Sequence, residues 1–119
     1  MSLVLVVDDE QAIREFLDDI LTGEGYQVST ASNGQEALTH LATAQPDLVL
    51  LDIMMPVLDG REVLRRMRAD PTLSRVAVLV MSAAADPGPL AGGFDSFLPK
   101  PFDLDRLLSA IEELLRSSP

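Results

Sequence analysis

The chain has 119 residues, 47% of them hydrophobic, so residues 1–119 fit one compact domain with its own core and leave no room for a second. It contains no cysteine, which excludes disulfide bonds and thiolate metal sites. Its formal net charge of −10 argues against nucleic-acid binding by this domain, because phosphate contacts are made mostly by clustered lysine and arginine, and it suits cation binding better.

The first two predicted elements are a buried strand and an amphipathic helix. Leu3–Val7 is a continuous apolar run, typical of a strand buried on both faces. Because this run is too short for a secretory signal or a membrane span, we expect a cytoplasmic protein without membrane contact. Apolar residues then recur at helical spacing until Gly23 and Gly25 end the helix. They are Ile13, Phe16, Leu17, Ile20 and Leu21.

An edge strand and a short helix come next. Residues 26–31 alternate between two faces, one of them polar, which favours a strand at the edge of a sheet. Asn33 followed three residues later by Glu36 resembles a capping box, in which each residue satisfies a backbone N–H near the other. It predicts a second helix that closes before Pro46.

The middle of the chain supplies two central strands around a third helix. Leu48–Leu51 and Ala77–Met81 are wholly apolar, which predicts burial on both faces. Asp59 with Glu62 is typical of a helix start, and that helix ends near Pro71. Five of the nine basic residues lie between positions 61 and 75, and we interpret them mainly as a solvated helix face.

The last elements are a short strand and a strongly amphipathic helix. Phe97 and Leu98 indicate a fifth strand, and Pro99 places it at an edge because proline lacks a ladder donor. The final helix carries one apolar stripe from residue 104 to residue 115. Between the fourth and fifth strands, residues 87–93 contain two prolines and three glycines, so we expect a mobile loop and a shortened or missing fourth helix.

This alternation predicts a flavodoxin-like, doubly wound, five-stranded parallel α/β sheet of order 2-1-3-4-5. In such sheets the ligand crevice lies beyond the carboxyl ends of the strands, where the winding reverses between strands one and three. Polar residues follow four of the apolar runs there. They are Asp8 and Asp9, then Asp52, Ser82 and Lys100.

The charges of these residues indicate a chemistry. Three carboxylates close together persist at neutral pH only if a cation or a proton offsets them. All the ligands are hard oxygens, which favours magnesium or manganese. An ion bound there can bridge to a phosphoryl group, while Lys100 and Ser82 bind its other oxygens. Asp52 can then attack in line and become an acyl phosphate.

The chain resembles response-regulator receiver domains over essentially its whole length, on residues that follow the strands in the expected order. They are the paired Asp8 and Asp9, the acceptor Asp52 with Pro56 and Asp59-Gly60 after it, Ser82, and Lys100-Pro101-Phe102. The resemblance implies that Asp52 takes a phosphoryl group from a phosphohistidine on a sensor histidine kinase or a histidine phosphotransfer protein. Small phosphodonors are implied as alternative sources, and the domain would catalyse only its own phosphorylation and dephosphorylation.

The resemblance also implies a cofactor and a partner surface. Magnesium would lie on Asp9, Asp52 and the Met54 backbone carbonyl, with Asp8 helping through water, and the peptide bond before Pro101 would be cis. The first helix would contact the kinase, with four polar side chains exposed. They are Gln11, Arg14, Glu15 and Asp18.

A switch is implied at Ser82 and Phe97. In the family the hydroxyl moves to meet the phosphoryl group, and an aromatic side chain three residues before the lysine rotates inward. Because Phe97 has no hydroxyl, we expect it to favour the buried rotamer already and the switch to be shallow. The residues that tune phosphoryl lifetime would be Met54 and Ala84. A homodimer is left open, because the family's dimer face includes the altered fourth helix.

Simpler interpretations and two other functions remain at this point. Asp8 and Asp9 could merely cap the first helix, and Asp59 is more typical of a cap than of a ligand. A haloacid-dehalogenase-type phosphatase also uses an aspartate at a strand end, but it needs a second aspartate two residues later, where this chain has Met54. A binding module that is never phosphorylated would keep the same fold.

Overall fold

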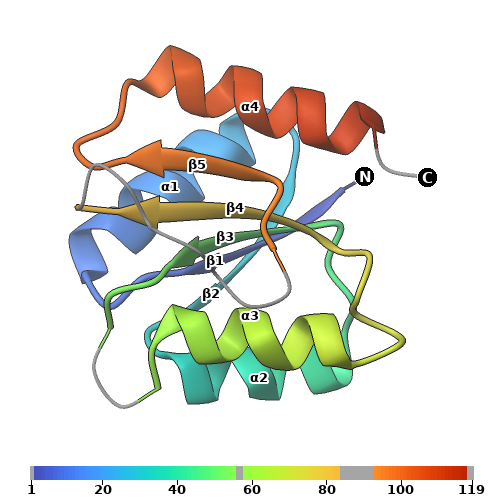
Figure 1. The fold of residues 1–119 in the computed structure, drawn as a ribbon. Coiled ribbons are helices and arrows are strands. Elements are labelled where there is room, and N and C mark those ends of the chain that lie inside the picture. The colour runs from blue at the N-terminus through green and yellow to red at the C-terminus, as the bar shows by residue number, and fades with distance from the viewer. Residues whose placement is uncertain (1, 56–57, 84–92, 118–119) are drawn as a thin grey trace.

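The computed structural model describes residues 2–55, 58–83 and 93–117 (Figure 1). Its strands are Leu3–Val7 (β1), Gln27–Ala31 (β2), Leu48–Asp52 (β3), Ala77–Ser82 (β4) and Ser96–Pro99 (β5). Its helices are Gln11–Gly23 (α1), Gly34–Thr43 (α2), Gly60–Ala69 (α3) and Leu104–Ser117 (α4). Each corresponds to an element predicted from the sequence. The expected loop and fourth helix between β4 and β5 fall largely on residues 84–92, outside the described residues.

The five strands form one parallel sheet in the order β2-β1-β3-β4-β5, as the sequence predicts. Helices α1 and α4 cover one face of this sheet, and α2 and α3 cover the other (Figure 1). Two apolar clusters fill the space under the helices, one on each face. Because β1, β3 and β4 contribute to both clusters, they read as continuous apolar runs in the sequence.

The starts of α2 and α3 are held by side-chain caps. Asn33 Oδ1 accepts a hydrogen bond from the Glu36 backbone N–H at 2.8 Å, as predicted. The reciprocal half of the capping box differs, because the Glu36 carboxylate accepts from the backbone N–H and the hydroxyl of Ser32 instead of from Asn33. Asp59 Oδ1 accepts from the backbone N–H groups of Arg61 and Glu62, so its role as a cap is confirmed.

Helix α1 differs from α2 and α3 at its start, and it departs from the sequence prediction on one face. Its N-cap residue, Glu10, makes no side-chain cap hydrogen bond. Phe16, expected in the core, is 47% exposed. The helix still buries Leu17 and Leu21 fully, which is enough to dock it on the sheet.

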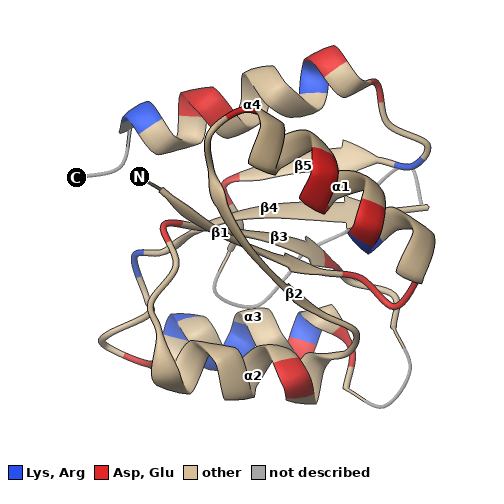
Figure 2. Cartoon of the chain, turned by 180° about the vertical axis from the view of Figure 1, so that it is seen from behind, with Lys and Arg blue, Asp and Glu red and all other residues tan. Residues whose placement is uncertain are grey.

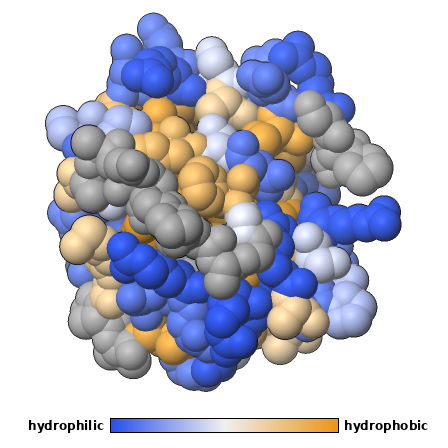
Figure 3. Space-filling model, in the orientation of Figure 1, coloured by the Kyte–Doolittle hydropathy of each residue, from blue (hydrophilic) through white to orange (hydrophobic). Residues whose placement is uncertain are grey.

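Hydrophilic residues cover the outer surfaces of α3 and α4, and apolar residues show between them beside β5 (Figure 3). Charge is also unevenly distributed, with basic residues banding α3 and acidic residues marking α1 (Figure 2). Within the described part of the chain, every helix falls short of the length and apolar content that crossing a membrane requires.

Candidate functional site

The carboxyl ends of the strands bring the predicted site residues to one edge of the sheet. Asp8 follows β1, Asp52 ends β3, Ser82 ends β4 and Lys100 follows β5. Asp8 and Ser82 are fully buried, and Asp52 is 3% exposed. Polar groups this deeply buried need partners, since desolvation otherwise disfavours them.

The Lys100 ammonium joins the two buried carboxylates. Its Nζ lies 2.7 Å from Asp8 Oδ2 and 3.3 Å from Asp52 Oδ2. The exposed Glu10 carboxylate is 3.6 Å from the same nitrogen. The backbone N–H of Lys100 donates to the Ser82 carbonyl at 2.7 Å, which holds the lysine against the end of β4. The Lys100–Pro101 peptide bond is cis, as the family resemblance implies.

Burial and charge act in opposite directions at this edge. Burial raises the pKa of Asp52 above its ordinary value, and the Met54 N–H and the Lys100 ammonium offset only part of that rise. Burial by itself would lower the pKa of Lys100, but its hydrogen bonds and charge interactions with Asp8 and Asp52 outweigh it and raise the pKa. The lysine therefore stays positive, while Asp52 retains a desolvation cost that a second cation would relieve.

Asp8 is held by contacts from three directions besides the lysine. Its Oδ1 accepts from the Glu10 backbone N–H, and its own N–H donates to the Ala31 carbonyl. Its backbone carbonyl accepts from Arg14 Nη1 at 2.8 Å. Arg14 was predicted to be exposed for a partner, so this half-buried contact corrects that prediction.

The other three polar residues named on α1 divide between exposed and half-buried positions. Gln11 and Glu15 are exposed and hydrogen-bonded to each other, as their one-turn spacing allows. Asp18 is only half-buried rather than fully exposed, and it accepts from the Thr22 hydroxyl.

Acidic side chains gather beside Lys100. Asp8, Asp9 and Glu10 each place a carboxylate oxygen within 4.8 Å of the others. Asp52 is not part of that trio and connects to it through Lys100. Sequence reasoning missed Glu10, although its signal was a third consecutive acid. Four carboxylates against one ammonium, with oxygen as the donor atom throughout, fit a hard divalent cation.

The structure also describes two further predicted residues, Met54 and Phe97. The Met54 backbone N–H donates to Asp52 Oδ1 at 3.0 Å, while its side chain is 56% exposed. Phe97 is half-buried, packs against the cluster under α2 and α3, and pairs with Val80 across the β4–β5 ladder. Ala84 lies outside the described residues.

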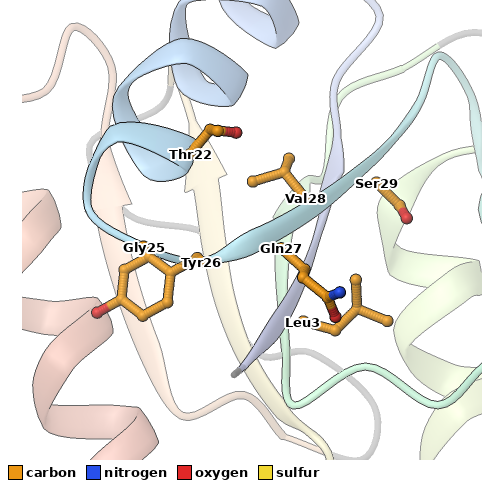
Figure 4. Close-up of a pocket in the computed structure, with 7 residues that line it drawn as sticks. All are labelled: Leu3, Thr22, Gly25, Tyr26, Gln27, Val28 and Ser29. Atoms are coloured by element: carbon orange, nitrogen blue, oxygen red, sulfur yellow. The ribbon is translucent and has the colours of Figure 1, made fainter.

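Two surface features lie away from this site. A shallow hollow on β2 is lined by Leu3, Thr22 and residues 25–29 (Figure 4). Because Leu3 and Gln27 begin their strands, it lies toward the opposite edge of the sheet from the carboxylates. On α3, Glu62 pairs with both Arg65 and Arg66, which lowers the pKa of Glu62 to about 2 and supports a solvated helix face.

Fold and site together define a flavodoxin-like α/β protein with an acidic centre closed by a lysine. The chain belongs to the response regulator receiver domain family, whose sequence pattern it matches over residues 4–112. Response regulator MprA of Mycolicibacterium vanbaalenii is 44% identical over 117 residues, which cover 95% of this chain and 50% of that protein. The chain thus spans about half the length of the curated relatives it matches.

Solved structures agree with this assignment. Response regulator TrrA of Thermotoga maritima, in complex with Mg²⁺-BeF, is 35% identical with a TM-score of 0.86, over 96% of this chain and 99% of that one. The signal receiver domain of a signal transduction histidine kinase from Syntrophus aciditrophicus is 32% identical with a TM-score of 0.90, over 98% and 91%. The chain is a receiver domain of the two-component response-regulator class.

Proposed function

We propose that Asp52 is the phosphoacceptor of this receiver domain and that the phosphoryl group comes from a phosphohistidine on a sensor histidine kinase or a histidine phosphotransfer protein. The observation that carries the proposal is the buried Asp52 carboxylate beside the Lys100 ammonium, 3.3 Å apart, at the edge where the sheet's winding reverses. The domain catalyses only the formation and loss of its own acyl phosphate.

In the transfer, a carboxylate oxygen of Asp52 forms a bond to phosphorus as the donor's N–P bond breaks, and the imidazole nitrogen leaves with the electron pair. The Lys100 ammonium stabilises negative charge on the phosphoryl oxygens, and the Ser82 hydroxyl donates to another of them. Met54, two residues after the acceptor, has no side-chain group that orients a water for hydrolysis.

The site is proposed to work with Mg²⁺ held by Asp9, Asp52 and the Met54 carbonyl, with Asp8 contributing through water. When bound, the ion neutralises charge on the phosphoryl group that the carboxylates would otherwise repel. The similar TrrA protein, whose structure was solved in complex with Mg²⁺-BeF, supports this choice of cofactor.

Output would follow from movement of Ser82 toward the phosphoryl group, with a small rearrangement at Phe97. Phe97 is already half-buried against the core, and it has no hydroxyl that exposure would satisfy, so the shift is shallow. NMR of the Phe97 ring with and without a phosphoryl mimic should show similar populations, whereas a large change would contradict this view.

The acceptor is tested by incubating the chain with a small acyl phosphate and Mg²⁺ and following the intact mass. The expected result is one phosphoryl group per chain, lost in Asp52→Asn and in EDTA. Asp19→Asn, which removes an exposed carboxylate on α1, is the matched control and should label like wild type. Phosphate release without accumulation of the phosphorylated chain would indicate a phosphatase, and absence of both labelling and phosphate release in wild type would indicate a binding module; either result would overturn the proposal.

A further inference from the structure

A glycine at the start of α2 touches the loop that follows the proposed acceptor. We propose that Gly34 is a positioning residue for the cation site, because its missing side chain lets α2 approach Leu58, just before α3, whose first residue contacts the backbone of Asp52. The proposal rests on the proposed function, since it concerns the same acidic centre. It assigns a role there to a residue that contacts none of the reacting groups.

The approach at Gly34 is close enough to require glycine. Its backbone N–H donates to the Leu58 carbonyl oxygen at 3.1 Å. A Cβ added at this position would lie 2.3 Å from that oxygen and 2.9 Å from both Leu58 Cβ and Val63 Cγ2. Two of these three atoms belong to the loop residue itself, so the loop or the helix would have to shift to admit an alanine.

A shift at Leu58 reaches Asp52 through the base of the loop. Gly60, two residues later, donates its backbone N–H to the Ile53 carbonyl at 3.3 Å. A Cβ at Gly60 would lie 2.4 Å from the Asp52 carbonyl oxygen and 2.6 Å from Ile53 Cα, so the backbone of α3's first residue rests on the end of β3. Moving Leu58 therefore moves the support of the acceptor strand.

Residues 31–34, which end at Gly34, also contact the part of the acidic centre that contains Asp8. The Ala31 carbonyl, at the end of β2, accepts the backbone N–H of Asp8 at 3.1 Å. Three residues on, Gly34 holds Leu58, and between them the caps of Ser32 and Asn33 to Glu36 fix the turn. Residues 31–34 thus set the spacing between the loop that carries Asp8 and Asp9 and the strand end that carries Asp52.

Gly34→Ala tests this directly, with Mg²⁺ as the probe. Isothermal titration on the folded chain should show Mg²⁺ binding weakened about tenfold or more, the loss typical of disturbing groups that support metal ligands. The amide NMR signals of Asp52 and Met54 should move from their wild-type positions without added metal. A purely structural role would leave both readouts unchanged.

Two control variants separate positioning from general effects. Gly23→Ala adds the same methyl group at the end of α1, where nothing lies within 4 Å, and should bind Mg²⁺ like wild type. Ile111→Val destabilises the fully buried core under α4, on the other face of the sheet, and should also leave Mg²⁺ affinity unchanged. Wild-type affinity in Gly34→Ala would overturn the inference alone.

A measurement on the wild-type chain covers the case in which Gly34→Ala does not fold. If Gly34 position affects Mg²⁺ binding, Mg²⁺ must affect Gly34 by the same coupling free energy. Hydrogen exchange of the Gly34 amide should slow with the Mg²⁺ dependence of the Asp52 amide signal, while the Gly23 amide stays unchanged. If Mg²⁺ leaves the exchange rate of the Gly34 amide unchanged, only this inference is overturned. If the wild-type chain binds no Mg²⁺, the proposed function is overturned as well.

Discussion

At the scale of single residues, the Lys100 ammonium compensates the two buried carboxylates, Asp8 and Asp52, to different extents. The ammonium is shared between Asp8 and Asp52, and its distance to Asp8 Oδ2 is 2.7 Å against 3.3 Å to Asp52 Oδ2. Asp52 is therefore the less fully compensated carboxylate, and burial dominates the rise of its pKa. A carboxylate in this state attracts either a proton or a second cation.

The raised pKa of Asp52 predicts a pH-dependent stability difference. An acid whose pKa is higher in the folded state binds its proton more tightly there. Its contribution to stability is therefore most favourable below the pKa of the unfolded state and is lost as the pH rises through the pKa of the folded state. Without divalent metal, Asp52→Asn should therefore be more stable than wild type at neutral pH, and the advantage should vanish below about pH 4, near the ordinary carboxyl value. Urea unfolding in EDTA across this range measures it.

Asp19→Asn controls for the loss of one charge, because Asp19 is exposed on α1. It should shift stability little at any pH in the same series, as surface substitutions usually do. Equal stability of Asp52→Asn and wild type at neutral pH would show that Lys100 fully compensates the acceptor, contrary to this interpretation.

At the scale of elements, Arg68 near the end of α3 connects three segments. Its Nη1 donates to the Ser74 and Val76 carbonyls before β4, at 2.9 Å and 2.8 Å. Its Nε donates to the Gly93 carbonyl, and its Nη2 contacts Asp95 Oδ2 at 3.1 Å. Asp95 in turn accepts from the Val78 backbone N–H, so α3, β4 and the entry to β5 share one guanidinium.

Arg68→Ala should destabilise the chain by about 2 kcal/mol or more, because it leaves the partly buried Ser74 and Val76 carbonyls without this donor and removes the ion pair of Asp95. Arg68→Lys should recover only part of this loss, since an ammonium is a point charge and cannot reproduce the planar fork that reaches several acceptors. Chemical denaturation monitored by circular dichroism gives both values. Full recovery in the lysine variant would mean that charge alone, and not the fork, does the connecting.

Arg75→Ala is the matched control, because it removes an exposed arginine from the same segment. It should change stability by less than about 0.5 kcal/mol, the usual range for surface positions. A comparable loss in both variants would assign the effect to net charge.

At the scale of the whole molecule, local patterns determined what could be foreseen. The apolar runs of β1, β3 and β4 and the cap at Asp59 are properties of neighbouring residues, so the sheet order and helix starts followed from them. The contact of Arg68 with Asp95 joins residues 27 apart, and no local pattern announces it. Phe16 likewise fits the helical period but faces outward, because period alone does not fix how wide the buried face is.

The candidate site shows the same division. The strand ends placed Asp8, Asp52, Ser82 and Lys100 at one edge, because parallel strands all point their carboxyl ends the same way. The backbone approach of Gly34 to Leu58 depends on how α2 packs against a residue from a later part of the chain. Such support is set by tertiary packing, so it becomes visible only in the folded chain.

The net charge of −10 and the acidic centre together predict how the whole molecule responds to Mg²⁺. Monovalent salt screens general repulsion, whereas an ion bound only in the folded state adds RT ln(1 + [L]/Kd), about 2.7 kcal/mol when Mg²⁺ is 100 times its Kd. The free energy of unfolding, measured with denaturant, should therefore be higher in MgCl₂ than in NaCl of equal ionic strength. An Asp9→Asn, Asp52→Asn double variant should lose this excess and keep only the salt effect. If the two salts stabilised wild type equally, Mg²⁺ would be acting as a screening ion and the acidic centre would not be a binding site.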